Sequence, residues 1–347
     1  MVLAAGGSFS GGSMTQDIAN ENKKIKNTEN GKPKNKKPIN KDLIFYSLLM
    51  IWPVLQFAVF YIGVNANSIL MAFQKISYVD PSAVGANGGS TVSVFTFEQF
   101  GKVFKWFSGY EFRSIMGVSV KFYLYTLIIS VPLGLLFSYY IYKKFAGWSI
   151  FRAMLFLPSI LSGVVMGAIY KFFCDSGVTE IISKITNDKT VLSILDVNSG
   201  KTFFAMLFFN LWISFGTSVL MYSNKMSGLD QEIVEAAHID GATGIREFWH
   251  ITMPYVYPTF SVFFITGFAQ ICSNQYNLYN IYGGSGMDPA VRNMGYYLFT
   301  EVSGKFSVGG LPELPYYSAM SVIITLVAVP VTFGVKWAVE KFGPSED

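Results

Sequence analysis

Residues 202–224 read TFFAMLFFNLWISFGTSVLMYSN, a run of 23 residues without a charged side chain. An α-helix needs about 20 predominantly apolar residues to cross the hydrocarbon core of a bilayer. The run is therefore predicted to form one membrane-spanning helix. Asn210, Ser214 and Thr217 follow one another at the i, i+4 and i+7 spacing, which places their side chains on a single face of that helix.

Five other stretches of the chain have the same uncharged character. These runs lie between Asp42 and Lys75 (32 residues), Lys121 and Lys143 (21), Arg152 and Lys171 (18), Glu247 and Asp288 (40), and Glu313 and Lys336 (22). Soluble domains carry about 25% charged residues, whereas this chain of 347 residues has 14% and a mean hydropathy of +0.39. Because unbroken apolar runs are unlike the alternating strands of a membrane barrel, we expect an all-α, polytopic membrane protein with six transmembrane helices.

Charge also divides the chain into segments. Residues 1–42 contain eight lysines and are predicted to form a disordered basic tail. Residues 43–114 are expected to hold the first span and an outer loop, residues 115–341 the other five spans, and residues 342–347 a second tail. Lysine-rich flanks stay in the cytoplasm, so the first tail places the N-terminus there, and six spans return the C-terminus to the same side.

The connection between the fourth and fifth predicted spans, residues 225–254, departs from this charge rule because it is acidic. We name it the elbow. Asp230 is expected to cap a short helix, Gly241 and Gly244 to stop it, and a second short helix to end before Pro254. A helix lying on the membrane surface would prefer Lys and Arg on its polar face, so the acidic elbow favours a protein partner with basic groups.

The elbow resembles the EAA loop of the membrane subunits of binding-protein-dependent ABC importers. That family's pattern is Glu-Ala-Ala, three residues, Gly, nine residues, Ile, one residue and Leu-Pro, with Met253 in place of Leu here, an apolar exchange of similar volume. The resemblance covers roughly residues 115–340 and is greatest to the carbohydrate-uptake permeases, whose Gly-Gly-Pro stretch is Gly283-Gly284-Ser285 in this chain. The residues that fit the pattern, and that the resemblance implies as ATPase-coupling residues, are Glu235, Ala236, Ala237, Asp240, Gly241, Ile251 and Pro254.

The resemblance implies the type I ABC importer permease fold and a chain that is not an enzyme. It implies a bacterial protein of the cytoplasmic membrane, with a second permease subunit, two cytoplasmic ATPase subunits and an extracellular solute-binding lipoprotein as partners. ATP and Mg would bind to the ATPases, and this chain would bind no cofactor. Gly200-Lys201-Thr202 is not a phosphate loop, because Leu195 stands where that motif needs glycine.

Polar side chains of two predicted spans are the candidates for the solute path, because amides and hydroxyls can hydrogen-bond the hydroxyl groups of a sugar. Such side chains also hydrogen-bond neighbouring helices in membranes, and both interpretations stay open. Ion-coupled carriers commonly place ionisable residues within their spans, and no Asp, Glu, Lys or Arg is found there, so the energy for import is expected to come from the ATPases. The candidates are Asn210, Ser214 and Thr217 in the fourth span, and Gln270, Asn274 and Asn277 on one expected helical face of the fifth.

The predicted function is therefore import of a sugar or oligosaccharide, with three alternatives: import of another neutral solute, a secondary carrier or channel acting alone, and a membrane scaffold. Neither a metal centre nor nucleic-acid binding is indicated, since His238 and His250 are twelve residues apart and much of the net charge of +4 lies in the first tail. The outer segment 95–107 is interpreted as an amphipathic interfacial helix. The alternative is a docking surface for the binding protein, a role also open to the loop at 283–286.

Overall fold

The computed structural model describes residues 41–78, 91–188, 190–284, 287, 291–307 and 313–344. Three predictions fall outside the described residues in whole or in part: most of the first tail, residues 285–286 of the candidate docking loop, and the end of the second tail. The chain divides into two compact units, Met1–Asn65 and Ala66–Asp347. Each is described by itself below.

The first unit is a single apolar helical rod. Helix α2 (Lys41–Gln56) continues through the π-helical stretch η1 (Phe57–Gly63) into α3 (Val64–Ala72), whose last residues belong to the second unit. The stretch from Phe45 to Ala72 is long and apolar enough to cross a membrane. Every described side chain from Phe45 to Asn65 is exposed, so this rod presents apolar surface on all sides, as expected where lipid or another chain surrounds it.

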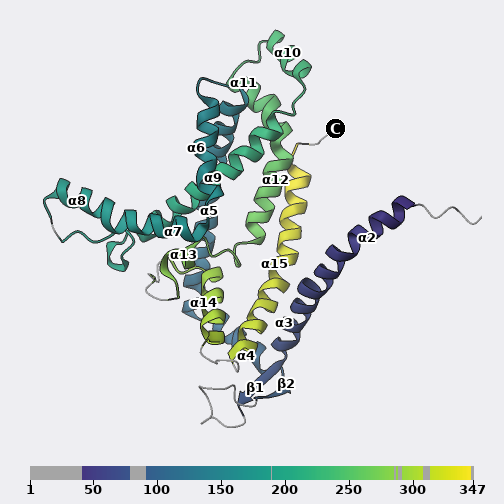
Figure 1. The fold of residues 1–347 in the computed structure, drawn as a ribbon, viewed down its shortest axis with the longest axis vertical. Coiled ribbons are helices and arrows are strands. Elements are labelled where there is room, and N and C mark those ends of the chain that lie inside the picture. Colours follow the sequence, from purple (N-terminus) through teal and green to yellow (C-terminus); the bar gives the residue numbers. More distant parts are fainter. Residues whose placement is uncertain are drawn as a thin grey trace, which may run out of the picture. The chain divides into compact units, whose positions relative to one another are not determined.

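Long helices form the body of the second unit, shown in Figure 1: α5 (Tyr110–Tyr142), α9 (Thr202–Met226), α12 (Met253–Ala269) and α15 (Leu314–Phe342). Helix α9 packs against α5 and against α6 (Trp148–Ile160). A methyl group on Gly216 of α9 would overlap the carbonyl group of Leu155 in α6. The absence of a side chain at Gly216 therefore permits the close approach of these two helices.

The third predicted span is broken. Helix α6 is followed by α7 (Gly163–Phe172), the π-helical stretch η3 (Phe173–Val178) and α8 (Thr179–Thr186), and the two parts meet at an angle of 100°. Figure 1 shows α7 and α8 running across the direction of α9. Leu161 has extended backbone at the break, and Pro158 one turn earlier removes a helical hydrogen bond, so the helix ends within the apolar run.

Each of the six predicted apolar runs contains helix in the structure. Among the described residues, four helices are long and apolar enough to cross a membrane, or five if the bent pair counts as one span. The fifth predicted span is represented by α12, whose 17 residues include two prolines and two tyrosines in its first half. The all-α, polytopic class is confirmed, with one exception outside the spans.

That exception is a two-stranded antiparallel ribbon of β1 (Gln74–Tyr78) and β2 (Thr91–Phe95), in which Gln74 lies opposite Phe95. Here the prediction of helical structure throughout does not hold, because β-branched and aromatic residues alternate with polar ones, which favours strands. Helix α4 (Glu98–Phe107) follows and packs against α15. It buries Val103 and exposes Glu98, Lys102 and Lys105, so residues 98–107 form the amphipathic helix expected within the segment 95–107, and its place at the membrane interface stays a prediction.

Three shorter elements also belong to the second unit. They are the short 3₁₀ turn η4 (Val197–Ser199), α13 (Leu278–Tyr282) and α14 (Met294–Ser307). Buried side chains of α13 and α14 join one apolar core with α5, α7 and α9, and a second core links α14 and α15 with α4. Cys174 lies buried in the first of these cores, in the packing role expected of a small apolar side chain.

Candidate functional site

The elbow begins as its sequence predicts. Helix α10 (Gln231–Ile239) starts after Asp230, whose carboxylate accepts a hydrogen bond from the backbone N–H of Glu232 at 3.0 Å. Gly241 and Gly244 both have positive φ angles, +80° and +57°, a region that glycine adopts without steric cost. Asp230 therefore fixes the start of α10, and the two glycines turn the chain after its end.

The second part of the elbow does not end before Pro254, contrary to the sequence prediction. Helix α11 (Ile245–Glu247) continues through the π-helical stretch η5 (Phe248–Thr252) into α12, in which Pro254 occupies the first turn. Pro254 has no N–H to close a helical hydrogen bond, and the π-helical stretch η5 lies directly before it in the continuous segment. The elbow is thus joined to α12 without a break.

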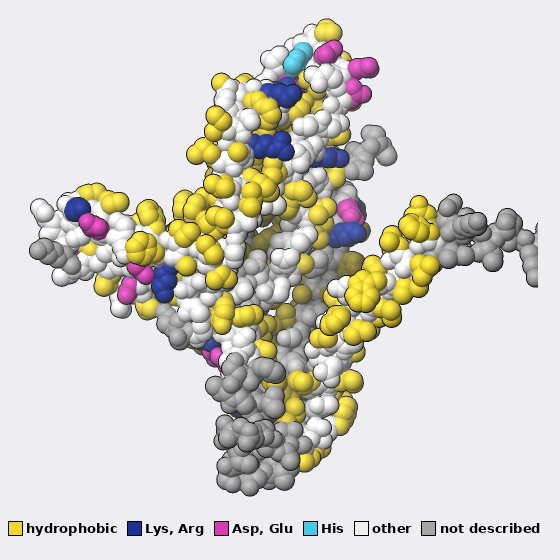
Figure 2. All heavy atoms as spheres, in the orientation of Figure 1, with side chains coloured by type: hydrophobic (Ala, Val, Ile, Leu, Met, Phe, Trp, Pro, Cys, Tyr) yellow, Lys and Arg dark blue, Asp and Glu magenta, His cyan; other side chains and the backbone are white. Residues whose placement is uncertain are grey.

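Helix α10 stands out from the bundle, and among its side chains only Val234 is buried. Ile233 and Ile239 are exposed, and so is Ile245 beyond the glycine turn. Figure 2 shows Asp, Glu and His side chains gathered at this end of the molecule, with Lys and Arg side chains close by. Of the predicted coupling residues, Glu235, Ala236, Asp240, Gly241 and Pro254 are exposed, and Ala237 and Ile251 are half-buried.

Glu247 is a site residue that the sequence reasoning missed. Its side chain is 1% exposed and pairs with the Nζ of Lys143 at 2.6 Å and with Nε2 of His238 at 2.9 Å. Burial alone would raise the pKa of the Glu247 carboxyl, but hydrogen bonds and charge from Lys143 and His238 outweigh burial and lower this pKa. One sequence signal was available, namely an acidic residue between the apolar Ile245 and Phe248 in a helical stretch.

All six candidate path residues line one cavity of about 580 Å³ within the second unit. The walls come from α5, α6, α9, α12 and the segment that follows α12, and no lining residue is charged. Ligand sites commonly measure about 300–1,000 Å³, so this cavity has room for a small solute. The candidates that it brings together are Asn210, Ser214, Thr217, Gln270, Asn274 and Asn277.

The six candidate residues lie on two kinds of local structure, a regular helix and an irregular segment. Asn210, Ser214 and Thr217 share one face of the unbroken helix α9, as predicted. The expected helical face of Gln270, Asn274 and Asn277 is wrong, because α12 ends at Ala269 and Asn277 has a left-handed backbone (φ +57°). Irregular backbone at membrane depth is tolerated only where protein buries it or where it lines a cavity, and this segment does line one.

Asn210 holds that irregular segment in place. Its Nδ2 donates to the backbone oxygen of Tyr276 at 2.7 Å, and its Oδ1 accepts from Nδ2 of Asn277 at 3.1 Å. Asn293 adds a third bond, from its Nδ2 to the backbone oxygen of Asn274 at 3.1 Å. The inter-element hydrogen bonding left open by the sequence is therefore present at Asn210 and Asn277, on the wall of the cavity.

Helix α5 contributes a third polar face that the sequence reasoning missed. Tyr123, Thr126 and Ser130 line the same cavity at spacings of three and four residues. Among the described residues, the buried hydroxyl of Thr126 has no hydrogen-bond partner. The signal lay in the uncharged run that ends at Lys143, where these hydroxyls recur with helical period.

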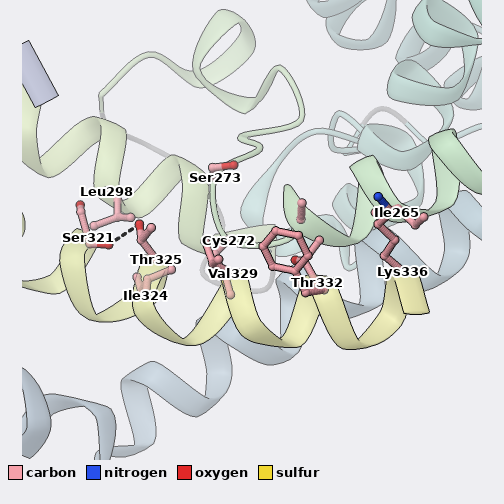
Figure 3. A pocket seen from close by; sticks show the side chains of 13 residues that line it. Ile265, Cys272, Ser273, Leu298, Ser321, Ile324, Thr325, Val329, Thr332 and Lys336 are labelled. Atoms are coloured by element: carbon pink, nitrogen blue, oxygen red, sulfur yellow. Dashed lines mark hydrogen bonds between the residues drawn. The ribbon is translucent and has the colours of Figure 1, made fainter. Parts of the chain in front are cut away.

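A second cavity, of about 500 Å³, lies along α15 and is shown in Figure 3. Its lining is mainly apolar, and the hydroxyl of Thr325 donates to the backbone oxygen of Ser321 in its own helix at 2.8 Å. Lys336 lies at one end of the cavity. With few polar groups free to face a solute, this cavity does not resemble a sugar site. Within the described residues, no group of His, Cys, Asp or Glu side chains could hold a metal ion.

These features define a class of protein. Apolar helices, an uncharged polar cavity between them and an exposed acidic elbow joined to the bundle are the parts of a polytopic membrane transport protein. Residues 123–345 match the family described as binding-protein-dependent transport system inner membrane component. The match covers more than half of the chain, and the protein belongs to this family.

Individual relatives agree with this assignment. The chain is 28% identical over 155 residues to the multiple sugar-binding transport system permease protein MsmF of Streptococcus mutans, covering 45% of this chain and 53% of MsmF. It is 26% identical over 207 residues to the arabinooligosaccharides transport system permease protein AraP of Bacillus subtilis, covering 59% and 61% of the two chains. The chain thus spans between 53% and 61% of the length of these curated relatives.

The fold has also been observed in solved structures. A chain in the crystal structure of a bacterial alginate ABC transporter in complex with an alginate pentasaccharide-bound periplasmic protein is similar, with a TM-score of 0.65. The two chains are 15% identical, and the similarity covers 87% of this chain and 96% of the other. The likeness establishes the ABC importer permease fold for this chain.

Proposed function

We propose that this chain is a permease subunit of an ATP-driven importer that moves a neutral sugar or oligosaccharide across the cytoplasmic membrane of a bacterium. The observation that carries the proposal is the cavity of about 580 Å³, in which all six candidate path residues meet without a charged neighbour. Amides and hydroxyls from three elements face this space, and the unpartnered hydroxyl of Thr126 is available to a ligand. Aromatic rings of Tyr123 and Tyr276 are suited to stacking on the CH surface of a sugar.

The chemistry of the cavity distinguishes between solutes. An acidic sugar or a sugar phosphate would call for an Arg or Lys in the path, and the cavity lining contains neither. Two relatives carry sugar or oligosaccharide transport in their names, which agrees with a neutral, hydroxyl-rich solute. The absence of acidic and basic side chains from the lining also disfavours a secondary carrier driven by protons or sodium ions.

The proposal includes the partners and the orientation expected from the sequence. The elbow faces the cytoplasm together with both chain termini, and it docks on one of two ATPase subunits, which bind ATP and Mg. A second permease subunit completes the membrane pair, and an extracellular lipoprotein delivers the solute, as the periplasmic protein in the alginate transporter complex suggests. The chain itself transports and catalyses no reaction, and residues 115–341 form its transmembrane domain.

Replacement of one elbow residue tests the coupling. Glu235 is exposed on α10, and Glu235→Lys reverses a charge offered to a basic partner group. We expect uptake of a labelled neutral sugar into proteoliposomes to be abolished while the two permease subunits still co-purify. Glu340→Lys changes an exposed carboxylate on α15 and is the matched control, with wild-type uptake expected. Normal uptake by Glu235→Lys would remove the elbow from the coupling mechanism.

A further inference from the structure

Helix α10 has few ways to pass a displacement to the bundle. Its only buried side chain is Val234, and its polar link is the contact of His238 with Glu247. A force applied to the exposed face of α10 can enter the bundle through Val234, through this link, along the two glycine turns, or through residues 227–230, which join α10 to α9. Glycine backbones transmit force poorly because they have the widest conformational freedom. The His238–Glu247 contact is thus the polar side-chain contact that joins α10 directly to α11, across the two glycine turns.

Glu247 joins three elements through one carboxylate. Its Oε2 lies 2.9 Å from Nε2 of His238 in the last turn of α10, and its Oε1 lies 2.6 Å from Nζ of Lys143, the residue that caps the C-terminus of α5. Glu247 itself ends α11, which continues into α12. The carboxylate therefore connects α10, α5 and the start of α12 at a single point.

A second set of contacts holds the same junction. The hydroxyl of Tyr139 in α5 donates to the backbone oxygen of Gly244 at 3.2 Å, and its ring meets the ring of Phe248 edge to face at 5.1 Å. Nζ of Lys143 also lies 5.7 Å from the centre of the Tyr139 ring. The end of α5 is thus attached to the chain on both sides of Glu247.

We infer that Glu247 is the positioning residue that makes α5 and α12 move with the elbow when a partner displaces α10. The inference rests on the proposed function, since it assigns the route by which the ATPase stroke enters the bundle. Only 1% of the Glu247 side chain is exposed, and separating this buried carboxylate from the Lys143 ammonium leaves an uncompensated charge. The junction therefore resists being pulled apart, and the three elements are displaced as one rigid body.

The test is Glu247→Gln in the complete complex of both permeases, two ATPases and the binding lipoprotein, reconstituted in proteoliposomes. The amide keeps the shape of the side chain and removes its charge. We expect the ATPases to co-purify and to hydrolyse ATP, while the amount of solute moved per ATP falls by roughly tenfold, within the usual range of coupling between sites. The probe is a mixture of radiolabelled neutral mono- and oligosaccharides. Glu340→Gln, in an exposed ion pair with Lys336, is the control and should keep the wild-type ratio.

A double variant separates positioning from fold stability. Glu247→Gln leaves Lys143 without its carboxylate partner, whereas Lys143→Met with Glu247→Gln removes both charges together. We expect the double variant to recover the thermal midpoint of the wild type but not its solute-to-ATP ratio. A wild-type ratio in Glu247→Gln, or recovery of the ratio together with the midpoint in the double variant, would overturn the inference. Neither result would touch the proposed function, which fails instead if wild-type uptake needs no ATP.

Discussion

Asn210 has two roles in the structure, which can be separated by substitution. It hydrogen-bonds the segment at Tyr276 and Asn277, and it also lines the cavity. Ser214 lines the same cavity, but its hydroxyl donates only to the backbone oxygen of Asn210 in its own helix, at 2.7 Å. Loss of the Asn210 side chain therefore affects both packing and path, whereas loss of the Ser214 hydroxyl affects the path alone.

We predict that Asn210→Ala lowers the free energy of unfolding by about 1–3 kcal/mol, the cost of leaving buried polar partners unsatisfied. Ser214→Ala should leave thermal unfolding near that of the wild type and still reduce sugar uptake. Thermal melting in detergent and uptake in proteoliposomes check the two parts. The contradicting outcome has two parts. Ser214→Ala would take up sugar at the wild-type rate, and Asn210→Ala would lose uptake only in proportion to its lost stability. These residues would then hold helices together without contacting the solute.

Gly216 allows a second prediction at this scale. A Cβ there would overlap the backbone oxygen of Leu155, and a backbone atom cannot move aside without shifting α6. Gly216→Ala should destabilise the protein by about 1–3 kcal/mol, the usual cost of overpacking. Gly117→Ala in α5 is the control, since a methyl group at Gly117 would have no neighbour within 4 Å, and it should stabilise by about 0.5–1 kcal/mol through helix propensity. Equal melting temperatures for the two variants would contradict the close helix packing.

The polar residues of the proposed solute path could be predicted from the sequence, but the ion pair of buried Glu247 with Lys143 could not. Asn210, Ser214 and Thr217 were identified because an unbroken helix carries its period in the sequence. Glu247 was missed because its importance comes from Lys143, which lies more than 100 positions earlier in the chain. Sequence spacing carries no information about a contact made only when α5 and the elbow pack together.

At the scale of elements, the predictions of an unbroken third and fifth span were wrong for the same physical reason. A run of uncharged residues shows that a segment is apolar, but not that its helix is unbroken. The third predicted span bends by 100° after α6, and the fifth ends at Ala269. At the second of these places a neighbouring helix satisfies the irregular backbone, since Asn210 bonds the backbone oxygen of Tyr276. The cluster of Ser and Asn after Ala269 was the available signal for a turn.

The ion pairs that join the ribbon to α4 lead to a prediction about how the order of this region depends on pH. The pKa of Glu98 is lowered to about 2. The main cause is its hydrogen bond with Lys75, followed by that with Lys102 and by the charges of both lysines. The pKa of a free glutamate is about 4.3. A carboxyl with a lowered pKa stabilises the folded state above its free pKa and loses that contribution as pH falls toward the lowered value. The order of β1 and α4 should therefore be constant from pH 7 to about pH 5 and decrease between about pH 4 and 2.

Hydrogen exchange of residues 74–78 and 98–107 in wild type and Glu98→Gln, compared at each pH, checks this prediction. The difference in protection between the two proteins should be present at pH 7 and should vanish near the lowered pKa of about 2. Glu180→Gln, in a comparable exposed pair with Lys184, should leave both segments unchanged. A difference that disappears already between pH 7 and 5 would contradict the pairing of Glu98 with the two lysines.

At the scale of the whole molecule, the distribution of charge is the basis of the proposed mechanism. The cavity has polar but uncharged walls, whereas ion-coupled carriers commonly place ionisable residues within their spans. Charge is concentrated instead at the elbow, where exposed acids face outward and a buried carboxylate faces inward. Under the proposed function, this arrangement separates the cavity that solute would cross from the elbow on which the ATPase would act.

The membrane class and the elbow could be predicted from sequence because both depend on composition and short-range spacing. The cavity could not be drawn from sequence, since it needs α5, α9 and α12 at defined distances, although two of its polar faces were identified. The third face, on α5, has the same helical period and was overlooked. Together these results favour import powered by a partner that binds the elbow.

Reconstitution with separate energy sources tests this account most directly. The complete complex is placed in proteoliposomes with labelled neutral sugar and binding lipoprotein on one side and the elbow on the other. ATP supplied on the elbow side without an ion gradient should drive accumulation of the sugar, and a proton or sodium gradient without ATP should drive none. Accumulation by this chain alone, powered by an ion gradient, would contradict the account.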